Sequence, residues 1–187
     1  MIGSGATEGR VEHAERQQWI ASDGSGRLLV TQGEKSVQPT GDYPPGQLVA
    51  AFLSASDPDA LAAALRKRNP GGSPSVAMKV FTGIWNNQVV PAALQRLLLF
   101  DLASYPDLYV ESSFQVFGES SGTAVGHIDP EQRIRQLLVF DQRTGALLGA
   151  ETTALDGAEV PVPTPAVISR TEWLLSGYSK ATSTPPT

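Results

Sequence analysis

The order of the secondary-structure patterns constrains this fold more than any other feature of the sequence. Helical patterns form one uninterrupted block from about residue 57 to residue 105, and strand-like patterns occupy about 11–37 and 108–175 on either side. Helices that do not alternate with strands cannot supply the crossovers that a parallel sheet needs. Strands that follow one another through short loops favour an antiparallel meander. The order therefore predicts an α+β fold and not a doubly wound one.

The helical block shows clear boundaries. Asp57-Pro58-Asp59 offers an N-cap, a proline for the first turn and an acid near the positive end of the helix dipole. Leu61 and Leu65 then share one face, and Arg66-Lys67-Arg68 falls in the last turn, where cations suit the dipole. We predict two further helices, from about Ser75 to Gln88 and from Pro91 to near Tyr105, each with an apolar stripe.

The flanking segments read as strands and turns. The first is a hairpin around Asp23-Gly24-Ser25-Gly26, and 38–46 is expected to be a loop because of its prolines and glycines. Strands are expected at 108–116, 123–128, 134–140 and 146–155, with a closing strand around 167–175. Alternation places Leu108, Val110, Ser112, Phe114 and Val116 on one face, and Val167, Trp173 and Leu175 on one face of the closing strand.

These patterns combine into one predicted architecture. A curved antiparallel sheet, a half-barrel-like meander, carries a block of about three helices packed on one face. Residues 1–10 are expected to be a flexible leader, 11–180 a single domain and 181–187 a disordered tail, because the two ends are small, polar or Pro-rich.

Composition narrows the possible chemistry. The chain has no cysteine, which excludes disulfides, thiolate zinc sites and cysteine nucleophiles. It also has only two histidines and a net charge of −5. No calcium-loop, P-loop or dinucleotide motif is present, so we expect no metal and no cofactor. Arg66-Lys67-Arg68 is interpreted as a solvated helix end, and no nucleic-acid partner is expected. No apolar run is long enough to span a bilayer, and no signal peptide is visible.

One catalytic motif requires consideration. Gly118-Glu119-Ser120-Ser121-Gly122 matches G-x-S-x-G, the nucleophile elbow of serine hydrolases, which needs a strand-to-helix turn, a histidine base and an acid. The residues that follow read as a strand, and His127 comes only seven positions after Ser120. We interpret the motif as a Gly/Ser hairpin loop and keep a hydrolase that uses Ser120 or Ser121 with His127 as an alternative.

The histidines and carboxylates add little. His13 has polar neighbours and is expected at the surface, whereas His127 stands beside Asp129 on a predicted strand without a nucleophile or a third metal ligand. Large apolar residues are usually core residues, but several could line a groove between the helices and the concave face of a curved sheet. The candidate groove-lining residues are Phe81, Trp85, Phe100, Phe114 and Trp173. No catalytic residue is predicted.

Four sequence blocks together carry a family resemblance. They are the tryptophan strand leading to Asp23–Arg27, "DPDAL" at 57–61, "PAALQRLLLFDLASYPDL" at 91–108 and "LLVFDQRTGALLGAE" at 137–151. This order resembles a family of actinobacterial proteins with one N-terminal membrane span and an extracytoplasmic domain, often encoded beside sigma factors. Gln142 stands where the family usually has proline, and Tyr105-Pro106-Asp107-Leu108 replaces its "LPGV". The strand pattern is also similar, at the level of fold, to the half-barrels of LolA-like lipoprotein carriers and of MucB and RseB.

The resemblance implies a regulatory or sensory role at the cell envelope and no transferable catalytic residue. We therefore expect a non-catalytic extracytoplasmic domain that binds a lipid, a peptide or an envelope protein, with membrane attachment only through a segment outside this chain. A third hypothesis is a purely structural domain whose helices dock on another chain. It predicts an exposed patch around Trp85 and Phe81.

Overall fold

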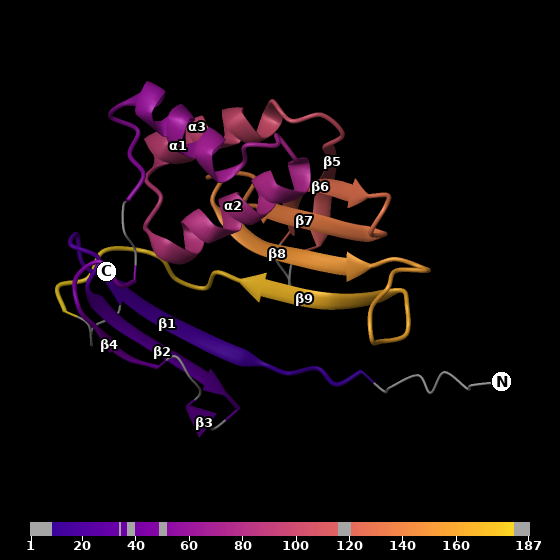
Figure 1. Ribbon diagram of the computed structural model, residues 1–187, viewed down its shortest axis with the longest axis horizontal. Coiled ribbons are helices and arrows are strands. Elements are labelled where there is room, and N and C mark those ends of the chain that lie inside the picture. The colour runs from indigo at the N-terminus through magenta and orange to yellow at the C-terminus, as the bar shows by residue number, and fades with distance from the viewer. Residues whose placement is uncertain (1–8, 34, 37–39, 49–51, 116–120, 182–187) are drawn as a thin grey trace.

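The computed structural model describes residues 9–33, 35–36, 40–48, 52–115 and 121–181. It confirms the α+β class: three helices cover one face of a five-stranded antiparallel sheet (Figure 1). A second, smaller antiparallel sheet built from N-terminal residues lies beside this unit and was not anticipated as a separate sheet. Neither sheet is closed.

The three helices begin and end close to the predicted positions. They are α1 (Pro58–Arg68), α2 (Pro74–Asn87) and α3 (Ala92–Ala103). Asp57 Oδ1 accepts a 2.9 Å hydrogen bond from the Ala60 N–H and caps α1 as expected. The turn between α1 and α2 is held by the side chain of Asn69, which donates to the Ser73 carbonyl (2.9 Å) and accepts from the Ser73 N–H (3.1 Å).

The large sheet has the order β5-β6-β7-β8-β9, so every strand pairs with its neighbour in sequence. Its strands are β5 (Tyr109–Gln115), β6 (Ser121–Asp129), β7 (Ile134–Phe140), β8 (Leu147–Ala154) and β9 (Ala166–Glu172). The predicted β7–β8 loop is confirmed: Asp141 Oδ1 accepts from the backbone N–H of Arg143 and Thr144, and Gly145 has a φ of 69°.

The core lies between the helices and the sheet. Phe81 and Trp85 of α2 stack with ring centroids 4.7 Å apart, and Phe81 meets Phe140 of β7 edge to face at 5.7 Å. The remaining buried members are apolar residues of all three helices and of β7 and β8: Leu61, Leu65, Ala77, Met78, Ile84, Leu94, Leu98, Leu102, Leu138 and Leu147.

The small sheet contains the predicted hairpin of β1 (Ala14–Ile20) and β2 (Gly26–Gln32). Two short strands, β3 (Lys35–Ser36) and β4 (Gly41–Tyr43), pair with the other edge of β2. The expectation of a loop over the whole of 38–46 is therefore wrong at Gly41–Tyr43. Thr40 anchors this strand because its hydroxyl accepts from the Val30 N–H (2.8 Å) and donates to the Val30 carbonyl (3.1 Å).

Two predicted strand faces are also wrong. Strand β5 contains a bulge between Glu111 and Phe114, with Ser113 at a φ of 64°, so the alternation is interrupted and Val110 is 68% exposed. Among the described residues beyond β9, only Trp173 packs against the core. Val167 and Leu175, which the alternation placed with it, are exposed.

Candidate functional site

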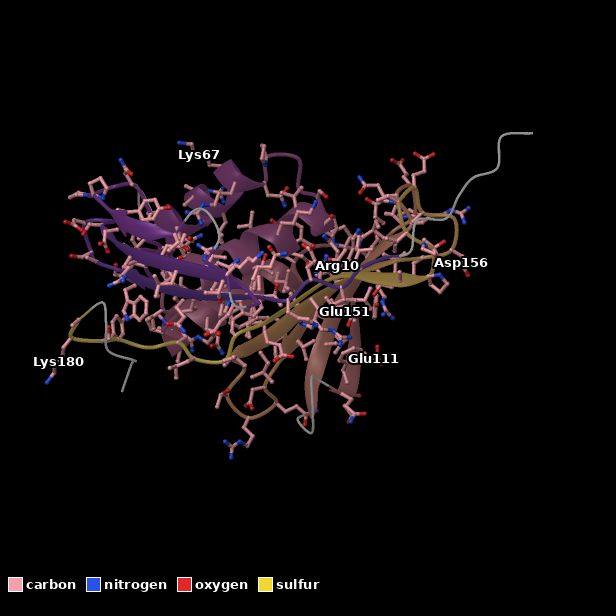
Figure 2. The ribbon with its side chains drawn as sticks, turned by 90° about the horizontal axis from the view of Figure 1, so that it is seen from below. Arg10, Lys67, Glu111, Glu151, Asp156 and Lys180 are labelled. Carbon is pink, nitrogen blue, oxygen red and sulfur yellow. The ribbon has the colours of Figure 1, made fainter. Side chains whose placement is uncertain are left out.

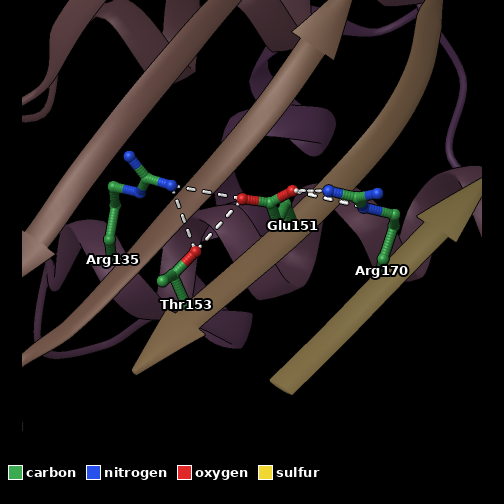
Figure 3. A network of polar contacts seen from close by, with 4 residues as sticks. All are labelled: Arg135, Glu151, Thr153 and Arg170. Atoms are coloured by element: carbon green, nitrogen blue, oxygen red, sulfur yellow. Dashed lines mark hydrogen bonds and ion pairs between the residues drawn. The ribbon is translucent and has the colours of Figure 1, made fainter. Parts of the chain in front are cut away.

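A polar network crosses three strands on the sheet face that points away from the helices (Figure 3). Strand register sets Arg135 of β7 opposite Thr153 of β8, and Glu151 of β8 opposite Arg170 of β9. Glu151 Oε1 accepts from an Arg135 guanidinium nitrogen (3.2 Å) and from the Thr153 hydroxyl (3.1 Å). Glu151 Oε2 accepts from two guanidinium nitrogens of Arg170, at 2.6 and 3.2 Å.

The geometry of this network suits cross-linking of strands better than catalysis. The Glu151 side chain is 5% exposed, and both of its oxygens already accept two hydrogen bonds. The guanidinium groups keep access to water, with side-chain exposures of 32% for Arg135 and 51% for Arg170. A carboxylate so fully used cannot also act as a base toward a substrate, so we interpret the network as structural.

A small apolar cluster lies on the same sheet face. Ala124, Leu137 and Val139 are almost fully buried there, under Tyr109, Phe114 and Leu148. The Tyr109 ring lies directly over Gly126, where an added Cβ would approach Tyr109 Cζ to 2.2 Å. Burial raises the pKa of the Tyr109 hydroxyl. The cluster explains why β7 is apolar on both faces. Leu138 and Phe140 pack in the helix–sheet core, whereas Leu137 and Val139 pack in this cluster.

The five candidate groove-lining residues are not brought together. Phe81 and Trp85 are buried in the helix–sheet core, and Trp173 packs against its edge, where its indole N–H donates to Asn86 Oδ1 (3.0 Å). Phe114 belongs to the cluster on the opposite sheet face. Phe100 is 68% exposed on α3. Because Phe81 and Trp85 are buried, the exposed patch expected around them by the structural hypothesis is not observed.

One crevice opens between the three helices. It has a volume of about 10 Å³ and is lined by Leu65 and Asn69 of α1, by α2, and by Leu98, Asp101 and Leu102 of α3. Such a volume holds about one water molecule, whereas ligand pockets measure roughly 300–1,000 Å³. Burial raises the pKa of the Asp101 carboxyl, against the opposing influence of Arg66. The crevice has no room for an acyl chain or a peptide side chain.

The residues of the hydrolase alternative do not assemble in the part of the chain that is described. Ser120 lies outside the described residues, and the residues after the motif form strand β6, where a nucleophile elbow needs a helix. His127 is buried, with Nδ1 3.4 Å from the Asp107 carbonyl. Asp129 accepts from the backbone N–H of Glu131 and Gln132 instead of orienting His127.

The described residues contain no candidate metal site and no candidate membrane span. No group of three or more His, Asp or Glu residues there could hold a metal ion. None of the helices within those ranges is long and apolar enough to cross a membrane.

Sequence reasoning missed the most unusual surface of the molecule. Five large apolar residues are exposed within twelve positions, on β9 and the segment after it; we call them the apolar strip: Val167 (48%), Ile168 (43%), Leu174 (82%), Leu175 (65%) and Tyr178 (73%). Single exposed apolar residues are common on proteins, whereas a contiguous group of them is typical of an interaction site. The concentration of apolar residues near the C-terminus is the available signal, but alternation alone predicts only one face of a closing strand for Val167, Trp173 and Leu175.

The apolar strip flanks Trp173, which the fold holds in place. Between its two halves, the Trp173 N–H donates to the Leu148 carbonyl (3.0 Å), and the Trp173 indole is bonded to Asn86 of α2. Strand β9 has β8 on one side, and no described strand pairs with its other edge. The strip is thus presented beside an edge strand.

Comparisons with protein-family models, with curated proteins and with solved structures found no match to this chain. The resemblance to an envelope family stays a prediction.

Proposed function

We propose that this chain is a non-catalytic binding domain that engages a partner protein through the apolar strip. The observation that carries the proposal is the exposure of Val167, Ile168, Leu174, Leu175 and Tyr178 on either side of the anchored Trp173. Burial of these side chains against a partner gains about 25 cal/mol per Å² of apolar surface. The sequence resemblance supports a partner in the cell envelope and an extracytoplasmic location for the domain.

A protein partner is favoured over a lipid held inside the fold. The space between the helices and the sheet is filled by Phe81, Trp85 and Phe140, and the inter-helix crevice has a volume of about 10 Å³. A protein segment, in contrast, needs only an exposed surface. A partner that adds an extended strand would use the outer edge of β9, with which no described strand pairs and along which the N-terminal segment and β1 run (Figure 1).

Site-specific photo-crosslinking tests the proposal. A photoreactive amino acid replaces Val167 or Leu174, and the protein is irradiated in its host cells. The matched control replaces Val110, which is also apolar, exposed and on an edge strand, but on β5 at the other side of the sheet. We expect one recurrent protein adduct from both strip positions and not from Val110. The same adducts from all three positions, or none from the strip, would contradict the proposal.

The absence of catalysis is tested separately. A fluorophosphonate probe labels activated serines. We expect no labelling of the folded chain, with a known serine hydrolase as the positive control. Labelling that disappears in a Ser120→Ala or His127→Ala variant would establish the hydrolase alternative instead.

A further inference from the structure

Charge is distributed unevenly between the helices and the rest of the chain. Residues 57–104 contain five basic side chains (Arg66, Lys67, Arg68, Lys79 and Arg96) and three acidic ones (Asp57, Asp59 and Asp101), for a net charge of +2. The whole chain carries −5, so the remainder carries −7. The helices therefore form the positive part of an acidic molecule.

Four of these basic residues and one aromatic residue gather on the exposed sides of α1 and α3. We call Arg66, Lys67, Arg68, Arg96 and Phe100 the basic helix surface; all five are exposed. On α3, Arg96 and Phe100 are one turn apart on the side opposite the buried Leu94, Leu98 and Leu102.

The C-terminal end of α1 lies beside the middle of α3. Leu65 and Asn69 of α1 line the same crevice as Leu98 and Asp101 of α3, and Arg66 is close enough to Asp101 to act on its carboxyl. The end of α1 that carries the basic triplet therefore lies beside the helix that carries Arg96 and Phe100. Figure 2 shows Lys67 projecting at the helix side, away from Glu111 on the large sheet.

The acidic residues of the helices leave this surface positive. Asp57 and Asp59 stand at the N-terminal end of α1, nine and seven residues before Arg66, or about 10–14 Å along the helix at 1.5 Å per residue. Asp101 is half-buried in the crevice wall. The outward side of the two helices carries small residues next to the cations, Ala63, Ala93 and Ala103, which permit close approach to a flat surface.

We propose that the basic helix surface docks on an anionic lipid bilayer. Clustered Lys and Arg near a negatively charged leaflet are attracted by about 1 kcal/mol each, and an exposed aromatic ring inserts at the level of the headgroups. A basic surface with one exposed aromatic ring complements a headgroup layer. An acidic protein is a poorer fit because Phe100 has no ring of exposed apolar neighbours on α3 to form the centre of a protein interface. This inference is independent of the proposed partner.

Vesicle co-sedimentation tests the docking. The chain is mixed with vesicles of phosphatidylcholine alone, or of phosphatidylcholine with about a third phosphatidylglycerol, at low salt and in high salt. We expect binding only to the anionic vesicles and loss of binding in high salt, because screening shortens the reach of surface charges. Equal binding to both vesicle types, or no binding to either, would overturn the proposal.

Variants locate the surface. Neutralising Arg66, Lys67 and Arg68 together to Gln is expected to weaken binding about 100-fold, which is about 1 kcal/mol for each charge. The matched control neutralises Lys35, Arg143 and Lys180, three exposed basic residues outside the helices, with the same change in net charge. The control is expected to weaken binding less than threefold. Equal losses in the two triple variants would show a net-charge effect and overturn the assignment to the helices.

Two further measurements separate the remaining possibilities. Phe100→Ser is expected to weaken binding several-fold without changing its dependence on salt; unchanged binding would refute insertion of the ring. Binding to soluble poly-glutamate as tight as to anionic vesicles would point to an acidic protein and overturn the lipid assignment. Circular dichroism confirms that each variant is folded, which is expected because all the altered side chains are exposed.

Discussion

Replacing Glu151 by Gln is expected to destabilise the fold by about 2–3 kcal/mol. The substitution keeps the side-chain shape but exchanges one carboxylate oxygen for an amide group, which can donate and not accept. If the amide faces Arg170, two hydrogen bonds from that guanidinium are lost; if it faces Arg135, the bonds from Arg135 and Thr153 are lost. In either orientation, the amide N–H groups of the substituted side chain face the N–H or O–H donors that the carboxylate oxygen accepted from.

The size of this effect follows from the burial of the three groups. Breaking a fully buried ion pair costs about 3–5 kcal/mol because the remaining charge has lost its partner in a dry environment. Here the guanidinium groups can turn toward water, with side-chain exposures of 32% for Arg135 and 51% for Arg170. This access lowers the expected cost to about 2–3 kcal/mol, or a decrease in Tm of roughly 5–10 °C for a chain of this length.

Urea unfolding followed by tryptophan fluorescence measures the change, with an unchanged m-value as the sign that the two-state comparison holds. Arg170→Met is the matched comparison and is expected to cost about 1–3 kcal/mol, because it leaves Oε2 of the buried Glu151 carboxylate without its two donors. A cost below about 0.5 kcal/mol for both Glu151→Gln and Arg170→Met would refute the reasoning.

Three further substitutions have defined outcomes. Gly126→Ala is expected to cost about 1–3 kcal/mol because its Cβ would meet the Tyr109 ring, and much less in a Tyr109→Ala background, as measured by a double-mutant cycle. Hydrogen bonds from Thr144 hold the pKa of Asp141 below its usual range, so this carboxylate stabilises the fold above the unfolded pKa, and the benefit is lost as pH falls through the folded value. Asp141→Asn should therefore lower Tm at pH 7 and approach the parent chain at about pH 2, well below the ordinary carboxyl value. Burial raises the pKa of Asp101, so ionisation destabilises the folded chain; Asp101→Asn should raise Tm at pH 7 with no gain below about pH 3. An Asp101→Asn gain that is equal at both pH values would contradict this cause.

The sequence predicted those parts of the fold that depend on neighbouring residues. Asp57 caps α1 and Gly145 takes the positive φ of the β7–β8 loop, because each is determined within about four positions of chain. The faces of β5 and β9 depend on non-local packing. The bulge at Ser113 interrupts one alternation, and Trp173 is fixed by Asn86, which is 87 positions away.

The candidate sites, like the strand faces, depend on residues that are far apart in the sequence. The aromatic residues predicted to line a groove were chosen by residue type, which does not distinguish a groove wall from a core: Phe81 and Trp85 are core residues, whereas Phe100 is at the surface. The network around Glu151 depends on the register of three strands. The available signal was Arg135, a charged residue two positions before the apolar Leu137 and on the same face of β7. Such a residue indicates that this face carries a polar partner on a neighbouring strand.

The two proposed contacts use different parts of the molecule. The apolar strip lies on β9 and the segment after it, whereas the basic helix surface lies on α1 and α3, and Figure 1 shows β9 at the edge of the sheet away from these helices. A domain that rests on a bilayer through its helices would therefore leave β9 accessible to a partner.

Hydrogen–deuterium exchange in the presence of the crosslinked partner tests the central claim most directly. If the apolar strip is the interface, exchange at residues 166–178 slows on addition of the purified partner, because backbone N–H groups of β9 and the following segment become protected. Residues 109–115 of β5, the other edge strand, keep their exchange rates. Unchanged exchange at 166–178 with a bound partner, or protection confined to another surface, would contradict the account.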